Sequence, residues 1–155
     1  MKVLIPILIG LLVVGCGKKD EEVLKMKKGF REWMAFAENG DANAQYQLGW
    51  MYYTGFVVEQ DHKESVKWYR KSAEQGNGFA QFSLALIYDT GRGVKQDNVT
   101  AYAWYNFAGA HEDENGKTLD KFRSRLSKEM TPEQITKAEE LVKEMVKKHP
   151  KLLKK

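Results

Sequence analysis

A repeat with a spacing of 36 residues constrains this chain more than any other feature of its sequence. Residues 37–72 and 73–108 are identical at 14 of 36 positions, whereas unrelated stretches share roughly two at ordinary residue frequencies. The identical pairs are Ala37/Ala73, Glu38/Glu74, Gly40/Gly76, Ala44/Ala80, Gln45/Gln81, Leu48/Leu84, Tyr52/Tyr88, Thr54/Thr90, Gly55/Gly91, Val58/Val94, Gln60/Gln96, Asp61/Asp97, Trp68/Trp104 and Tyr69/Tyr105. Units of this length stack side by side and share one continuous core.

The spacing within each unit predicts two helices. Ala44, Leu48 and Tyr52 lie four residues apart and recur 36 positions later, so they form one stripe along a first helix. Gly55 ends that helix, because glycine reaches the left-handed geometry that a helix C-terminus often needs. Asp61 begins the second helix as its N-cap. Gly91 and Asp97 repeat both signals in the second unit.

These motifs resemble the Sel-one-like repeat family, relatives of the tetratricopeptide repeats. The matches are Ala44-Gln45-Tyr46-Gln47-Leu48-Gly49, Gly91-Arg92-Gly93-Val94, Trp68-Tyr69 and Trp104-Tyr105. The resemblance implies an all-α fold, a short right-handed α-solenoid of helix-turn-helix repeats with capping helices. It also implies a protein that binds other proteins. Two positions depart from the family pattern: Val57 and Ala85 stand where the family has glycine.

The flanks of the repeats supply the expected caps of a repeat domain at 23–149. Upstream, residues 21–38 are predicted to be helical, with Val23, Phe30, Trp33 and Ala37 on one face. Trp33 stands 36 residues before Tyr69, so this helix resembles the second helix of a missing unit. Downstream, capping helices are expected within 116–149. Thr131-Pro132-Glu133-Gln134 reads as the start of the last one, Pro150 stops it, and the basic tail 150–155 is expected to fray.

The first 22 residues differ in kind from the rest. Met1-Lys2 precedes an apolar run, 3–14, that is too short to span a bilayer and reads as a signal peptide, 1–15. Val13-Val14-Gly15-Cys16 resembles the bacterial lipobox, which implies that Cys16 carries a palmitate-type lipid and that 16–22 is a tether. Gly17 after the cysteine favours an outer-membrane anchor facing the periplasm. The alternative is an ordinary signal peptide that contains a cysteine.

The residues that usually carry catalysis lack a matching arrangement in this sequence, so an enzyme is not predicted. His62, His111 and His149 have no second histidine or cysteine at ligand spacing, and we expect no metal, cofactor or catalytic residue. Cysteine-rich relatives have been linked to β-lactam hydrolysis, but this chain has one cysteine. A cell-wall or β-lactam hydrolase therefore stays the alternative, and an inhibitor of a secreted protein a special case of binding.

The distribution of charge indicates one more candidate for a binding surface. From residue 117 onward there are 12 Lys or Arg against 6 Asp or Glu. This basic end could touch anionic lipid, or it could be a solvated face. A nucleic-acid partner is not expected for an exported chain.

Partner-binding residues are predicted on the first helix of each unit, which lines the concave face of such a solenoid. Positions that lie off the core stripe and differ between units form the expected surface: Asn43, Gln47, Trp50, Phe79, Ser83 and Leu86. Aromatic residues such as Trp50 and Phe79 are common anchors in interfaces. The alternative is that both pack against a cap helix. The prediction is thus a membrane-anchored adaptor of the cell envelope that binds a protein or peptide.

Overall fold

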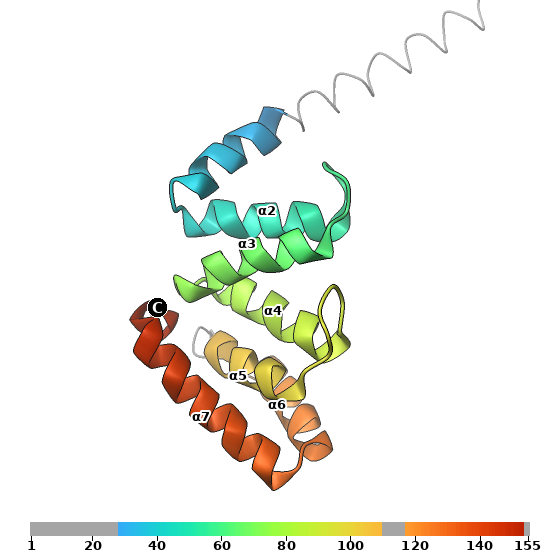
Figure 1. The fold of residues 1–155 in the computed structure, drawn as a ribbon, viewed down its shortest axis with the longest axis vertical. Coiled ribbons are helices and arrows are strands. Elements are labelled where there is room, and N and C mark those ends of the chain that lie inside the picture. The colour runs from blue at the N-terminus through green and yellow to red at the C-terminus, as the bar shows by residue number, and fades with distance from the viewer. Residues whose placement is uncertain (1–27, 110–116, 154–155) are drawn as a thin grey trace, which may run out of the picture.

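The protein is a stack of antiparallel helices, and the computed structural model describes residues 28–109 and 117–153 of it. A helical segment at 28–38 comes first. The elements that follow are α2 (Ala42–Thr54), α3 (His62–Glu74), α4 (Gly78–Thr90), α5 (Asn98–Gly109), α6 (Lys117–Glu129), α7 (Pro132–Lys148) and the 3-10 helix η1 (Pro150–Leu153). Figure 1 shows the helices stacked in chain order, with α7 running back along the stack. The described part of the chain contains no strand, and the all-α solenoid is confirmed.

The predicted helix boundaries have the capping geometry that the sequence indicates. Gly55 and Gly91 adopt left-handed φ angles of 69° and 73° at the ends of α2 and α4. The Asp61 side chain accepts the backbone N–H of Glu64 at 2.9 Å, and Asp97 accepts that of Thr100 at 3.2 Å. Each cap satisfies backbone donors that have no partner within the helix, so the boundaries are set locally.

The repeated glutamine explains how one unit is joined to the next. The side-chain amide of Gln45 donates to the backbone carbonyl of Ala37 at 3.0 Å, and Gln81 donates to that of Ala73 at 3.2 Å. Both glutamines are buried. A helix C-terminus leaves carbonyl groups without partners, so each glutamine satisfies one such group on the preceding helix.

Within the first unit α2 and α3 approach closely. The Ser65 hydroxyl donates to the Gly49 carbonyl at 2.7 Å, and the Ser72 hydroxyl donates to the Ala42 carbonyl at 2.6 Å. The Tyr69 ring lies on Gly49, where an added Cβ would stand 2.5 Å from Cδ1 of the ring. Small residues on α2 therefore set the distance between the two helices.

Val57, which replaces a glycine of the repeat pattern, has a different backbone φ angle from Gly93, but the hydrogen bond across the loop is the same in both units. The Asp61 amide donates to the Tyr52 carbonyl at 2.9 Å, and the equivalent bond from Asp97 to Tyr88 is also 2.9 Å. Gly93 has a φ of 75° and lies so close to His62 that a Cβ would meet it at 2.3 Å. Val57 avoids positive φ and packs against the first core cluster instead.

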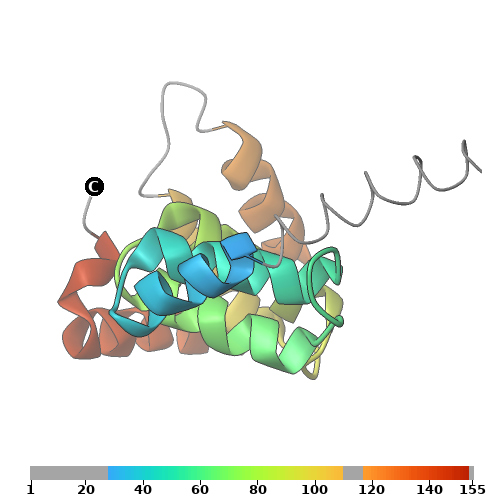
Figure 2. The same ribbon diagram turned by 90° about the horizontal axis from the view of Figure 1, so that it is seen from above.

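The two C-terminal helices pack on different sides of α5. Figure 2 shows α6 projecting from one side of the stack, away from α7. The Phe122 ring of α6 stacks on Tyr105 at 5.4 Å between centroids and meets Phe82 edge-on at 5.6 Å. Asp89, buried on α4, accepts a hydrogen bond from the Tyr105 hydroxyl at 3.0 Å and pairs with Arg125. These contacts fasten α6 to the second unit.

Two expectations from the sequence are wrong at the ends of the domain. Trp33 does not share the buried face of its helix: Ala37 is buried and Phe30 half-buried, but Trp33 is exposed. The tail does not fray at Leu152, which is fully buried and whose carbonyl accepts the Gln81 amide at 3.0 Å. Leu152 stands among lysines in the sequence, but it lies in the core beside Gln81, which is 71 residues away in the sequence.

The predicted signal peptide, Cys16 with its tether, residues 110–116 with His111, and the last two lysines lie outside the described residues. In the described ranges, no helix has the length and apolar character needed to cross a membrane.

Candidate partner-binding face

The outer sides of α2 and α4 form a surface that we name the first-helix face. It is defined by Asn43, Tyr46, Gln47, Trp50, Phe56, Phe79, Ser83 and Leu86. α2 carries no charged residue, and α4 carries only Asp89, which is buried. The whole face is therefore uncharged.

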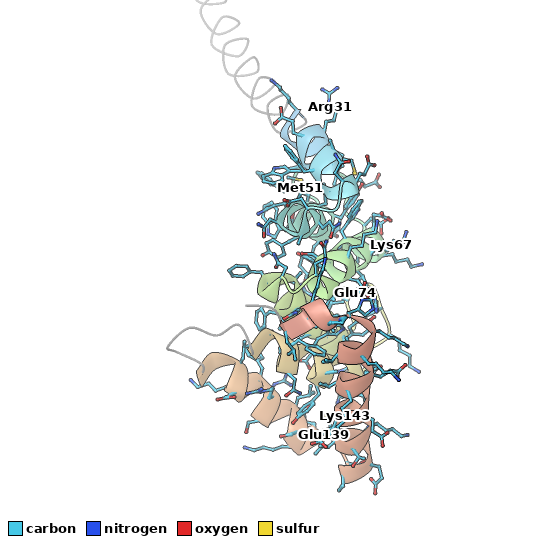
Figure 3. The ribbon with its side chains drawn as sticks, turned by 90° about the vertical axis from the view of Figure 1, so that its left-hand side faces the viewer. Arg31, Met51, Lys67, Glu74, Glu139 and Lys143 are labelled. Atoms are coloured by element: carbon cyan, nitrogen blue, oxygen red, sulfur yellow. The ribbon has the colours of Figure 1, made fainter. Side chains whose placement is uncertain are left out.

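Two other helices, α3 and α7, are rich in charged residues and differ from this face. α3 holds six charged residues in thirteen, and α7 carries both glutamate and lysine side chains. Figure 3 labels the exposed Lys67 on α3 and the exposed Glu139 and Lys143 on α7. α5 is also uncharged, but α6 and α7 cover it on two sides. The uncharged α5 is thus a helix that other helices cover.

Aromatic rings gather on the first-helix face. The Phe79 side chain is 73% exposed and its ring lies 5.8 Å from that of Tyr46, which in turn lies 5.7 Å from Tyr69. Trp50 is 40% exposed and lies 6.4 Å from the exposed Phe56. Partial burial raises the pKa of Tyr46 above its ordinary value, so its hydroxyl stays neutral.

The predicted polar residues lie at the edge of this aromatic group. Asn43 is exposed, and its side-chain oxygen accepts the Asn77 amide at 3.0 Å. Gln47 is half-buried. Ser83 is half-buried and its hydroxyl donates to the Phe79 carbonyl at 2.9 Å. Leu86 packs against the larger core cluster and leaves part of its surface accessible.

Sequence reasoning missed two residues of the face. Tyr46 occupies the position of Phe82 in the next unit, and comparison of the units at this position would have drawn attention to it. The Phe82 ring is covered by Phe122 of α6, whereas the Tyr46 ring meets Phe79. Phe56 lies in the loop, where the second unit has Arg92, and only the structure brings it next to Trp50.

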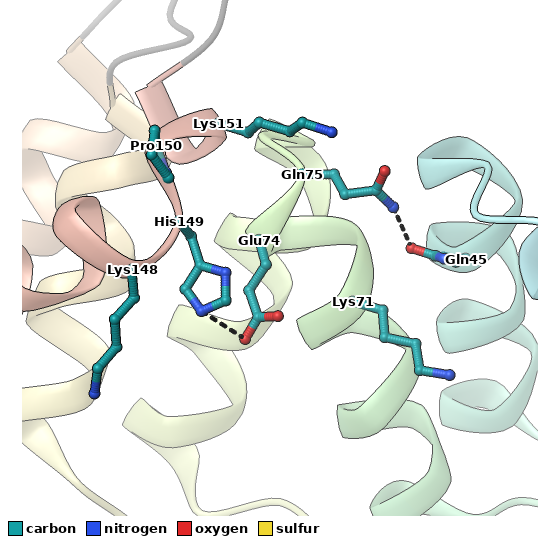
Figure 4. Close-up of a pocket in the computed structure, with 8 residues that line it drawn as sticks. All are labelled: Gln45, Lys71, Glu74, Gln75, Lys148, His149, Pro150 and Lys151. Atoms are coloured by element: carbon teal, nitrogen blue, oxygen red, sulfur yellow. Dashed lines mark hydrogen bonds and ion pairs between the residues drawn. The ribbon is translucent and has the colours of Figure 1, made fainter.

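A hollow of about 410 Å³ lies between the C-terminal ends of α3 and α7, apart from the first-helix face. Figure 4 shows its side chains, among them Glu74, Gln75 and His149. His149 Nε2 lies 3.8 Å from Glu74 Oε1, and Gln75 donates to Gln45 at 2.7 Å. Glu74 is the single carboxylate in the lining, so the pair of carboxylates that acid–base hydrolysis uses is not present there.

Metal-binding clusters are likewise not found within residues 28–109 and 117–153, where no three His, Cys, Asp or Glu side chains converge. Two α-helices per unit, glutamine bonds between units and an uncharged aromatic face define an α-helical repeat solenoid. The repeat is the Sel1 repeat: residues 42–77 and 78–113 each match its model, so the chain contains two Sel1 repeats. Each match begins at the first helix of a unit and has the 36-residue period of the sequence.

Two solved structures are similar to this chain. One is a protective antigen present in uropathogenic Escherichia coli strains that displays an SLR fold, with 32% identity, a TM-score of 0.73, and coverage of 82% of this chain and 27% of the antigen. The other is a Sel1 repeat protein from Oxalobacter formigenes, with 32% identity, a TM-score of 0.55, and coverage of 58% and 37%. The chain thus spans well under half the length of either. No curated protein matches the sequence.

Proposed function

We propose that this protein is an adaptor of the bacterial cell envelope that binds a protein or peptide segment on the first-helix face. Sel1 repeat proteins generally mediate protein–protein interaction and are typically non-enzymatic scaffolds. The observation that carries the proposal is the pair of uncharged first helices with exposed aromatic rings at Trp50 and Phe79. Exposed aromatic side chains on a neutral surface are frequent centres of binding energy.

The second repeat unit supports the proposed binding face, because a helix of the chain packs on the surface of α4 that corresponds to the Tyr46 side of α2. Phe122 of α6 covers Phe82, and Arg125 of α6 pairs with Asp89. On α2 the equivalent aromatic ring, Tyr46, has no such helix over it among the described residues. A partner segment with apolar side chains fits this surface in the way that α6 fits the second unit.

Binding is tested by crosslinking the protein in intact envelopes and purifying it with its partner. Trp50→Ala and Phe79→Ala are each expected to weaken capture by about 30-fold, the effect of losing a central anchor. Lys67→Ala on α3 is the matched control, because Lys67 is exposed on a second helix and pairs with Glu64 of the same helix. Equal capture by all three variants would contradict the proposal.

Anchoring is the second part of the proposal, and the lipobox-like residues around Cys16 support it. Two or three acyl chains at Cys16 would hold the protein firmly on a membrane. We place it on the outer membrane facing the periplasm. Cys16→Ser is expected to move the protein out of the membrane fraction or leave the precursor uncleaved, and metabolic labelling with a palmitate analogue reads out the lipid. A variant that fractionates and labels like the wild type would contradict the anchor.

A further inference from the structure

The N-terminal helical segment, residues 28–38, corresponds to the second helix of a repeat unit. At the 36-residue spacing it matches residues 64–74 of α3. Ala37 and its equivalent Ala73 are both buried, and each offers its carbonyl to the glutamine of the next unit. The segment thus packs on α2 in the same way that α3 packs on α4.

In α3, the opposite side is filled by a first helix. Ser65, Tyr69 and Ser72 face α2, where they contact Gly49 and Ala42. Tyr69 is 3% exposed and Ser72 is 0% exposed as a result. A first helix that presents small residues is therefore what this kind of surface binds within the protein.

On residues 28–38, no helix of the described part of the chain covers the equivalent side. An added Cβ at Gly29, the counterpart of Ser65, would meet nothing within 4 Å. Trp33, the counterpart of Tyr69, is 37% exposed, and Phe36, the counterpart of Ser72, is 58% exposed. Figure 3 shows Arg31 pointing into solvent at this end of the stack. The open side consists of two large aromatic rings beside a glycine.

We propose that this side binds an α-helix of a partner protein, which takes the place of the missing first helix. The partner helix presents small residues to Trp33 and Phe36, as α2 presents Gly49 and Ala42 to Tyr69 and Ser72. The new contact extends the existing stack by one helix, because it uses the positions through which α2 and α3 already pack. This surface is separate from the first-helix face and consists of different residues.

The chain's own sequence does not match the missing helix. At the repeat spacing, a first helix for this unit falls on residues 6–18. Leu8 and Val13 then occupy the positions of Ala44 and Gly49. The two units carry Gly49 and Ala85 at this position, and a branched valine over-packs against the ring on the facing helix, since even a Cβ on Gly49 stands 2.5 Å from Tyr69. The helix that fits comes from another molecule.

The test uses the purified full chain in detergent micelles with the photo-crosslinker benzoylphenylalanine in place of Phe36. The probe is a synthetic peptide with the sequence of residues 41–55, which is the first helix that this protein pairs with α3. We expect crosslinking to the peptide at position 36. A peptide with Gly49→Val is expected to crosslink about fivefold less, because an over-packed contact weakens binding by at least that factor.

Placing the crosslinker at Ala35 is the matched control, because Ala35 is exposed on a different side of the same helix. Equal yields at positions 35 and 36, or with the two peptides, would overturn the proposal, as would crosslinking of position 36 to residues 1–24 of the same chain. A bilayer is the other possible occupant. The tryptophan fluorescence of the protein is therefore also measured in vesicles of brominated phosphatidylglycerol. Quenching that occurs in the wild type and is lost in Trp33→Phe would assign this side to lipid and overturn the proposal.

Discussion

The close contact between Gly49 and Tyr69 allows a stability change to be worked out in both sign and size. Gly49→Ala removes the entropic disadvantage of glycine in a helix interior, which by itself stabilises by about 1 kcal/mol. It also places a Cβ 2.5 Å from Cδ1 and 2.7 Å from Cε1 of Tyr69. That ring cannot move away freely, since Tyr69 is buried and lies against Tyr46.

Over-packing of this kind costs about 1–3 kcal/mol, and the distance places Gly49→Ala at the upper end. The free energy of unfolding should therefore fall by about 1–2 kcal/mol, and the melting temperature by about 4–8 °C. Urea unfolding followed by circular dichroism measures both. The partner change Tyr69→Leu removes the ring, so in the double variant the cost of the alanine should largely disappear.

Ala85→Gly is the control in the second unit. Ala85 occupies the position of Gly49 and is fully buried, so its replacement removes a methyl group and restores the entropic cost of glycine. Both single variants should thus destabilise, although they change the side chain in opposite directions. A Gly49→Ala protein that is more stable than the wild type would refute the proposed role of glycine in setting the distance between α2 and α3.

Three further predictions concern the C-terminal half and the tyrosines. Asp89→Ala should lower the free energy of unfolding by about 1–3 kcal/mol and speed amide hydrogen exchange in α6, because Tyr105 and Arg125 lose their shared acceptor; unchanged exchange in α6 would contradict this. Leu152→Ala should lower the free energy of unfolding in urea by about 2–4 kcal/mol, whereas Leu153→Ala, at an exposed position, should lower it by less than about 0.5 kcal/mol. Equal losses would be inconsistent with the burial of Leu152. Burial raises the pKa values of Tyr69 and Tyr105 above 10, so above that pH the unfolded chain loses protons that the folded one keeps; stability should then fall as pH rises beyond about 10, and Tyr69→Phe should reduce the slope.

Much of the candidate site could be predicted because its signals are local in sequence. Trp50 and Phe79 lie off the core stripe of their helices, and a helix period of 3.6 residues is enough to separate the two sides. Their exposure depends on whether another element covers them, which periodicity does not report. Phe56 was missed because loop residues have no such period, and its position beside Trp50 depends on how the loop folds.

The sequence by itself determined the repeat, the helix pairs and their caps. Side chains within four residues of a helix end satisfy its free backbone groups, so Asp61, Gly55 and Thr131 act wherever the helix is placed. Only the tertiary structure decided what covers each apolar surface. Leu152 is buried because the chain returns to α3 and α4, whereas no first helix covers the exposed Trp33 among the described residues. Burial depends on neighbours that are distant in sequence, and local patterns carry no record of them.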